Sequence, residues 1–214
     1  MNFDDPKVQA VLDGYRRRLE EDDGRMRELG PEGFARRDEF LLPVGEEAAW
    51  FLHSLIVARR PQRICELGTS YGYSTLFLSH AAREVGAKVV TMDVADYKQA
   101  YAAEQLQAAG LADHVELRCG DAIQLLADDP GPWDFALLDI WKDLYVPGFE
   151  ALYPKLSEEA VVCSDNMISP KAARPNARDL RAAIKAKGDM HTALLPVGQG
   201  IELSVKWSAG NAKL

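Results

Sequence analysis

The chain has 214 residues, 47% of them hydrophobic, which suits one globular domain with a substantial core. Its formal net charge of −8 argues against nucleic acid as the main partner, because phosphate backbones attract basic surfaces. No uncharged apolar stretch is long enough to cross a bilayer, and Asp4 and Asp5 place acidic residues where a signal peptide would carry basic ones. We therefore expect a soluble cytoplasmic protein without a membrane partner.

The three cysteines indicate neither a disulfide scaffold nor a zinc site. Cys65, Cys119 and Cys163 lie in or at the end of apolar runs, and they lack both an even count and the close Cys/His spacing of zinc ligands. We expect buried, reduced thiols.

The N-terminal part of the chain is helical in pattern. Val8, Leu12, Tyr15 and Leu19 recur at helical spacing, and a second amphipathic helix is expected to begin near Gly45. From residue 63 onward, short apolar runs alternate with helical segments. The predicted strands are 63–67, 88–94, 115–119, 133–139 and 160–164, the predicted helices are 74–82, 97–109, 121–126, 149–156 and 177–186, and 192–196 with 201–207 form a predicted hairpin.

This alternation predicts an α/β fold. Right-handed crossovers would give a mostly parallel sheet covered by helices on both faces. We see no internal repeat or linker, so we expect one domain over residues 1–214, with a helical N-terminal extension (1–60) and an α/β core (61–214).

Ligands of such sheets bind at the carboxyl ends of the strands. The first strand ends at Glu66, and Gly68 and Gly72 follow in the turn to the next helix, where they would let a ligand approach the backbone. Ser70 stands where the dinucleotide fingerprint needs glycine, so NAD is disfavoured.

Two further strand ends carry polar residues. Asp93 ends the second strand, where it either accepts the hydroxyls of a ribose or caps the following helix. Asp121 and Ala122 follow the third strand and could face an adenine edge.

The fourth and fifth strands end in oxygen-bearing side chains. If these strands are neighbours, Asp139, Asp165 and Asn166 converge and would suit Mg²⁺, Mn²⁺ or Ca²⁺; the alternative is that Asp165 and Asn166 only cap a loop. Lys142 stands three residues beyond Asp139, as a general base for a substrate hydroxyl or as a solvated loop lysine.

Together these motifs resemble the cation-dependent O-methyltransferases, a group of class I S-adenosylmethionine (SAM)-dependent enzymes that includes catechol O-methyltransferase and caffeoyl-coenzyme-A O-methyltransferase. The matching segments are 42–45 (LPVG), 66–68 (ELG), 72–74 (GYS), 91–93 (TMD), 138–143 (LDIWKD) and 165–166 (DN).

The resemblance implies a Rossmann-like, seven-stranded sheet whose last strand is antiparallel. It also implies transfer of a methyl group from SAM to a hydroxyl of a small, catechol-like acceptor, with a divalent cation, most simply Mg²⁺. Asp139, Asp165 and Asn166 become metal ligands, and Lys142 becomes the base. The implied cofactor-binding residues are Val44, Glu66, Gly68, Ser70, Ser74, Asp93, Asp121, Ala122 and Asp139.

Substrate contacts are implied less directly. Glu202 matches a glutamate that holds the second substrate hydroxyl, with an edge-strand surface residue as the alternative, and Trp141 is a second substrate candidate. The catechol enzyme has histidine where Ile140 stands, and the coenzyme-A-type enzymes have aspartate where Trp141 stands, so the acceptor is not named. The acceptor pocket is expected to be shaped by Phe34, Arg36, Arg37 and Phe40.

Two other functions remain open at this point. One is a metal-independent small-molecule methyltransferase, and the other is a non-catalytic module that binds SAM or a related adenosyl ligand. The chain could be a monomer or a homodimer.

Overall fold

Residues 1–207 are described by a computed structural model, and within them the strands form one seven-stranded sheet of order β3-β2-β1-β4-β5-β7-β6. The predicted domain extends to residue 214, so its last seven residues, 208–214, lie outside the described range. The strands are β1 (Arg63–Leu67), β2 (Lys88–Asp93), β3 (Val115–Cys119), β4 (Trp133–Leu138), β5 (Leu156–Ser164), β6 (Met190–Leu195) and β7 (Ile201–Lys206).

The strand directions match the expected fold. The pairs β3–β2, β2–β1, β1–β4 and β4–β5 are parallel, whereas β7 is antiparallel to both β5 and β6. The predicted α/β class, the antiparallel last strand and the terminal hairpin are therefore confirmed.

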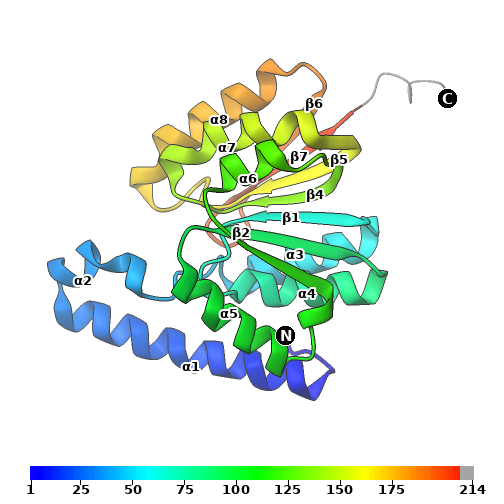
Figure 1. Cartoon of the computed structure of the whole chain (residues 1–214). Helices are drawn as coiled ribbons and strands as arrows, with labels where there is room; N and C mark the ends of the chain where they lie inside the picture. Colours follow the sequence, from blue (N-terminus) through cyan, green and yellow to red (C-terminus); the bar gives the residue numbers. More distant parts are fainter. Residues whose placement is uncertain (208–214) are drawn as a thin grey trace.

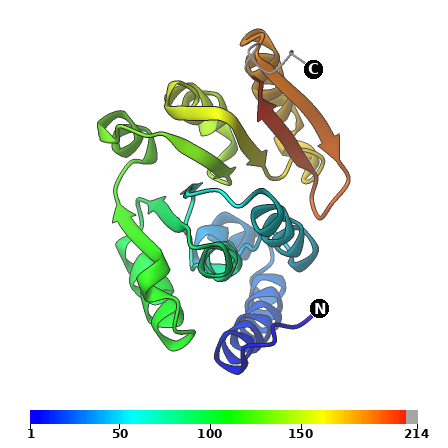
Figure 2. The same cartoon turned by 90° about the vertical axis from the view of Figure 1, so that its right-hand side faces the viewer.

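Helices cover both faces of the sheet (Figure 1). One face carries α3, α4 and α5, with α1 packed outside them, and the other carries α6, α7 and α8; Figure 2 shows the two layers from the side. The helices are α1 (Pro6–Leu29), α2 (Pro31–Ala35), α3 (Glu46–Arg59), α4 (Tyr73–Val85), α5 (Asp96–Ala108), α6 (Ala122–Asp128), α7 (Tyr145–Leu152) and α8 (Arg174–Ala186), with short 3₁₀ segments η1 (Arg37–Glu39), η2 (Ala112–His114), η3 (Lys142–Leu144), η4 (Tyr153–Lys155) and η5 (Lys171–Ala173).

The helical N-terminal residues pack onto the α/β core. Val8 and Leu12 of α1 are fully buried in the same hydrophobic cluster as Leu52 of α3 and Phe77 of α4. The Tyr15 hydroxyl donates to the backbone carbonyl of residue 71, in the turn after β1, at 2.6 Å. The apolar stripe of α1 therefore fixes this helix against the turn where a ligand is expected.

Two predicted elements in one region have wrong boundaries. The helix predicted at 149–156 is α7, which runs from Tyr145 to Leu152, and β5 begins at Leu156 rather than at residue 160. The pairing of β4 with β5 passes from Trp133↔Leu156 to Phe135↔Val161, so β5 carries extra residues in an irregularity that exposes residues 158 and 159. Such a bulge breaks the alternation by which a strand is predicted.

The expectation for the cysteines is wrong at one position. Cys65 and Cys163 are buried, but Cys119 is exposed, because it ends β3 at the edge of the sheet. Among the helices of residues 1–207, none combines the length and apolar character that a membrane crossing needs.

Candidate active site

The turn from β1 into α4 brings two strand ends into contact. Gly68 follows β1 with a φ of +102°, and a Cβ atom there would lie 2.1 Å from the carbonyl oxygen of Asp139. That separation is far below van der Waals contact, so only glycine lets the two segments meet. The predicted cofactor turn and the predicted metal segment therefore touch at Gly68.

Glu66 lies beneath this turn and is completely buried. Its carboxylate accepts hydrogen bonds from the hydroxyls of Ser74, Thr75 and Thr91, each at 2.6 Å. Burial raises the pKa of Glu66 to about 7, although the three hydroxyls oppose the shift. Glu66 and Ser74, both predicted to bind a cofactor, thus bind each other and fix the start of α4 against the sheet.

Asp93 holds the same turn from β2. Its Oδ2 accepts from the backbone N–H of Ser70 at 2.7 Å, and its Oδ1 accepts from the backbone N–H of Ala95 at 2.9 Å. The N-cap residue of α5 is Ala95, so Asp93 is not a helix cap. Asp93 and Ser70 therefore lie in contact at the turn, as a shared cofactor role would need.

The remaining cofactor candidates have structural partners of their own. Asp121 is the N-cap of α6, and its Oδ1 accepts from the N–H groups of Ile123 and Gln124 at 2.8 and 3.2 Å. Ala122 begins α6 and is half-buried, whereas Val44 is buried in the core. Cofactor contacts of Asp121, Ala122 and Val44 stay a prediction.

Asp139 and Asp165 are held at one edge of the sheet by main-chain hydrogen bonds. The N–H of Asp139 donates to the carbonyl of Leu67 at 2.9 Å, and the N–H of Asp165 donates to the carbonyl of Leu138 at 3.2 Å. Because β1, β4 and β5 are parallel neighbours, the residues that follow them stand in a row. The Nζ of Lys142 completes the row at 3.0 Å from Oδ1 of Asp139.

The oxygens of this row suit a hard divalent cation. Within residues 1–207, Oδ1 of Asp165 is buried and finds no hydrogen-bond partner. Burial raises the pKa of Asp165, and the negative charge of Asp139 raises it further. A bound cation would lower this pKa. The amide N–H of Asn166 donates to Oε1 of Gln199 at 2.8 Å, which leaves the amide oxygen of Asn166 free to act as a ligand.

The amide oxygen is needed to complete such a site. In the described part of the chain, no three His, Cys, Asp or Glu side chains form a group that could hold a metal. Asp139 and Asp165 supply two carboxylates, and Asn166 follows Asp165 directly. The donor set fits Mg²⁺, Mn²⁺ or Ca²⁺ rather than zinc.

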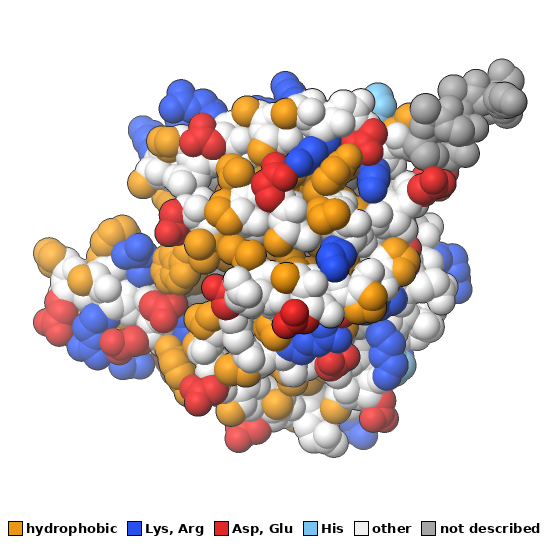
Figure 3. Space-filling model, turned by 45° about the horizontal axis from the view of Figure 1, so that its top comes forward, with side chains coloured by type: hydrophobic (Ala, Val, Ile, Leu, Met, Phe, Trp, Pro, Cys, Tyr) orange, Lys and Arg blue, Asp and Glu red, His pale blue; other side chains and the backbone are white. Residues whose placement is uncertain are grey.

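The N-terminal segment reaches the segment after β4 through Arg37. Its guanidinium lies 5.0 Å from the ring centroid of Phe34 and 5.1 Å from that of Trp141. Phe34 and Trp141 are 65% and 44% exposed, and Figure 3 shows hydrophobic side chains beside the arm that α1 and α2 form. Phe40 is instead buried, and Arg36 pairs with acidic residues of its own segment.

Residues 21–207 match the O-methyltransferase family, and this match covers most of the chain. The chain belongs to the O-methyltransferase family. Catechol O-methyltransferase B of Danio rerio is 31% identical over 144 residues, which are 64% of this chain and 54% of that protein. Catechol O-methyltransferase of Mycobacterium tuberculosis is 32% identical over 128 residues, 59% and 58% of the two chains.

The chain spans about half the length of these curated relatives. Solved structures share the fold: cofactor-bound Rv0187 from MTB has a TM-score of 0.71 at 27% identity and covers 77% of this chain and 82% of its own. The O-methyltransferase TomG from Streptomyces achromogenes, in complex with SAM, has a TM-score of 0.74 at 23% identity, over 97% and 92%. The resemblance to the O-methyltransferases is therefore confirmed.

In this O-methyltransferase-family chain, Glu202 is not a surface residue of an edge strand. It lies on β7, between β5 and β6, and is 1% exposed. Its Oε2 accepts from Arg181 at 2.5 Å, and its Oε1 accepts from the hydroxyl of Thr192 at 2.6 Å. Glu202 also pairs across strands with Ser164, the residue before Asp165. It is therefore close to the metal candidates through the pairing of β7 with β5, but it is already bound to other side chains.

Two residues near the site were not predicted from the sequence. Gln199 orients Asn166, and Arg181 neutralises Glu202. Both contacts join segments more than 20 residues apart in the chain, so no local spacing signals them. The glycines on either side of Gln199 indicate the turn that carries it, but not its partner.

Proposed function

We propose that this family member transfers a methyl group from SAM to one hydroxyl of a small, catechol-like acceptor, with a divalent cation at the site. The observation that carries the proposal is the contact of Gly68 with Asp139. A cofactor bound at the turn would lie beside the cation ligands and Lys142. The names of the relatives support the acceptor class, and the SAM-bound TomG supports the cofactor.

The cofactor would be held by the turn and by the strand ends around it. A carboxylate has about four lone-pair sites, so Asp93 can accept ribose hydroxyls in addition to its two backbone partners. Ser70 would present its backbone beside Asp93. Because Glu66 is buried with Ser74, both would act by fixing the turn. Asp121, Ala122 and Val44 would contact the adenine and the methionine portion from neighbouring loops.

The chemistry would depend mainly on alignment. Bound SAM would supply an electrophilic methyl group, and a bound cation would fix the acceptor oxygens and favour the oxyanion. Asp139, Asp165 and Asn166 would hold that cation. Nζ of Lys142, next to Asp139, would take the proton of the reacting hydroxyl when it is in its neutral amine form, and would become an ammonium beside the Asp139 carboxylate. Orientation of this kind can lower a barrier by about 7–11 kcal/mol.

The acceptor ring would lie against Trp141, whose exposed indole stacks with Arg37 at the edge of the site. Glu202 is bound to Arg181 and Thr192, so we propose that it supports the acceptor site by holding Arg181 rather than by direct contact.

The test is methyl transfer from labelled SAM to a catechol and to the matching monohydroxy phenol, each with Mg²⁺ and again with EDTA. We expect transfer to the catechol, loss of transfer in EDTA and recovery with excess Mg²⁺. Equal transfer in EDTA would overturn the cation assignment. Transfer to the phenol at the same rate would overturn the need for a vicinal pair of hydroxyls.

A further inference from the structure

A hollow between α8 and β6 gathers positive charge, of which the proposed mechanism uses only Arg181. Its volume is about 360 Å³, and within the described residues no acidic side chain lines it. The whole chain has a formal net charge of −8, so a local group of cations is not a consequence of composition. We call this hollow the α8 groove, and its lining residues are Met167, Lys171, Arg174, Pro175, Ala177, Arg178, Arg181 and Leu194.

Three of the four cations of the α8 groove are not balanced by an ion pair. Arg181 is paired with the buried Glu202. In the part of the chain that the structure describes, Lys171, Arg174 and Arg178 have no acidic side chain within ion-pair distance. All three are exposed, and Figure 3 shows Lys and Arg side chains along the upper edge of the molecule, where α8 lies.

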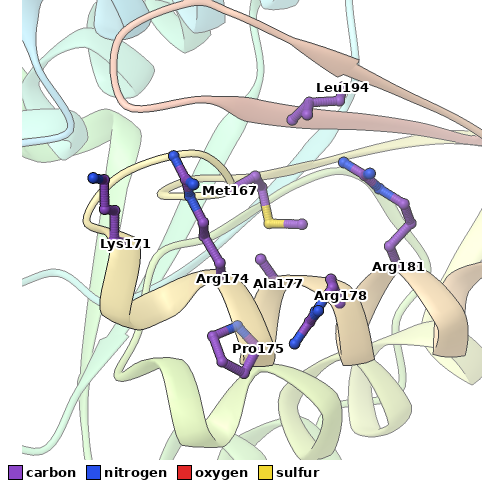
Figure 4. Close-up of a pocket in the computed structure, with 8 residues that line it drawn as sticks. All are labelled: Met167, Lys171, Arg174, Pro175, Ala177, Arg178, Arg181 and Leu194. Atoms are coloured by element: carbon purple, nitrogen blue, oxygen red, sulfur yellow. The ribbon is translucent and has the colours of Figure 1, made fainter.

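Two of the arginines are held in place. The Nε of Arg174 donates to the carbonyl of Ile168 at 2.9 Å, and Arg181 donates from Nε and from a terminal nitrogen to Glu202. A guanidinium has five N–H donors, so each keeps donors for a further partner. In Figure 4, Lys171, Arg174 and Arg181 leave the helix on the side that faces Met167 and Leu194. The groove thus presents fixed donors of one charge.

The α8 groove adjoins the candidate active site. Met167 lines the groove and directly follows Asn166, and consecutive Cα atoms are about 3.8 Å apart. Glu202, which holds Arg181, pairs in register with Ser164, one residue before Asp165. A small molecule with a hydroxyl at Asp165 and Asn166 can therefore place another part in the groove.

We propose that the α8 groove binds an anionic group of the methyl acceptor, so that the preferred acceptor is a hydroxylated aromatic compound bearing a carboxylate or a phosphate. This rests on the proposed function, because the groove is assigned to the acceptor of that reaction. Arginine forks match carboxylate and phosphate oxygens, and such charge-assisted bonds are about twice as strong as neutral ones. Amine-bearing catechols would be disfavoured by the same charges.

The test compares three acceptors that all keep the two neighbouring ring hydroxyls. They are dihydroxyphenylacetate, the neutral ethylcatechol, and hydroxytyrosol phosphorylated at its alkyl hydroxyl. The variant is the double charge reversal Lys171→Glu with Arg174→Glu, both exposed positions whose side chains face Met167 and Leu194. Its matched control is Lys7→Glu with Arg17→Glu, which changes the net charge equally at exposed positions of α1. Affinities are measured by calorimetry with S-adenosylhomocysteine bound, and kcat/KM is measured in parallel.

We expect the unmodified protein to bind the anionic acceptors about tenfold more tightly than ethylcatechol at low salt. The preference should be smaller in the presence of about 0.5 M NaCl, because salt screens the charges. The double reversal should remove the preference, and the control should keep it. A larger preference for the phosphate ester would identify phosphate as the group, and a larger one for the acid would identify carboxylate.

The same ratio of affinities in the double reversal and in the control would overturn the proposal. Calorimetry needs no methyl transfer, so the two proposals fail separately. If no catechol is methylated but the anionic preference is present and is lost in the double reversal, the groove stands and the proposed reaction does not.

Discussion

Replacement of Gly68 by alanine tests whether the contact between the turn and Asp139 holds the site together. The new Cβ would lie 2.1 Å from the carbonyl oxygen and 2.9 Å from the carbonyl carbon of Asp139. Both atoms are backbone, so no side-chain rotation can relieve the overlap. Either the turn or the segment after β4 must move.

The expected loss of stability has two parts. A φ of +102° is unfavourable for alanine and costs about 1–3 kcal/mol. Displacing the backbone costs about another 1–3 kcal/mol, as overpacking does in cores. Gly86→Ala is the matched control, because Gly86 has a φ of +77° and nothing within 4 Å of its added Cβ. Only the backbone cost, about 1–2 kcal/mol, applies there.

Thermal unfolding of the two variants separates these parts. Gly68→Ala should lower Tm by about 2–12 °C more than Gly86→Ala, since the overlap adds about 1–3 kcal/mol and 1 kcal/mol corresponds to about 2–4 °C for a domain of this size. Its kcat should also fall, because a shift of about 1 Å in a reacting group can cost 10²-fold. Equal Tm values and full activity in Gly68→Ala would refute the contact.

Three other changes test individual side chains. Glu66→Gln should flatten the pH dependence of stability. Burial raises the pKa of Glu66 from 4.5 to about 7 in the folded protein, so ionisation of Glu66 lowers the free energy of unfolding by about 3 kcal/mol as pH rises through that window. Parallel curves of Tm against pH for the unmodified protein and the variant would contradict this. Lys142→Ala and Lys142→Arg should both lose about 10²–10⁴-fold in kcat, with the affinity for S-adenosylhomocysteine unchanged. A kcat near that of the unmodified protein in Lys142→Arg would show that only the ion pair with Asp139 matters. Gln199→Leu leaves the Asn166 amide without its acceptor and should weaken Mn²⁺ binding by about 10–100-fold. Gln199→Glu keeps an acceptor and should keep the Mn²⁺ affinity. Equal Mn²⁺ affinities in the two variants would remove Gln199 from the metal site.

Much of the fold follows from local patterns. Apolar runs alternate with helical segments from residue 63 onward, and this alternation has one common solution, a parallel sheet with helices on both faces. The start of β5 was missed because the bulge opposite Trp133 puts two exposed glutamates inside a strand. A bulge depends on the partner strand, so a single segment does not indicate it.

In the candidate site too, some residues could be predicted from the sequence and some contacts could not. Asp93, Asp139, Asp165 and Asn166 could be found because each lies at the end of a strand or within two residues after it, and parallel strands end at one edge. Some partners of these side chains come from distant segments: Ser70 is 23 residues from Asp93, and Gln199 is 33 residues from Asn166. The bond of Glu66 to Thr91, 25 residues away, and the pairing of Arg181 with Glu202 are likewise contacts that no local pattern predicts.

Binding of Mn²⁺ followed by electron paramagnetic resonance tests the central claim, a divalent cation held at the ends of β4 and β5. The comparison is between the unmodified protein and Asp165→Ala, each with S-adenosylhomocysteine, with methyl transfer to a catechol measured on the same samples. The account predicts one class of bound Mn²⁺ that supports transfer, and loss of both in Asp165→Ala. Unchanged Mn²⁺ binding and transfer in that variant would contradict it.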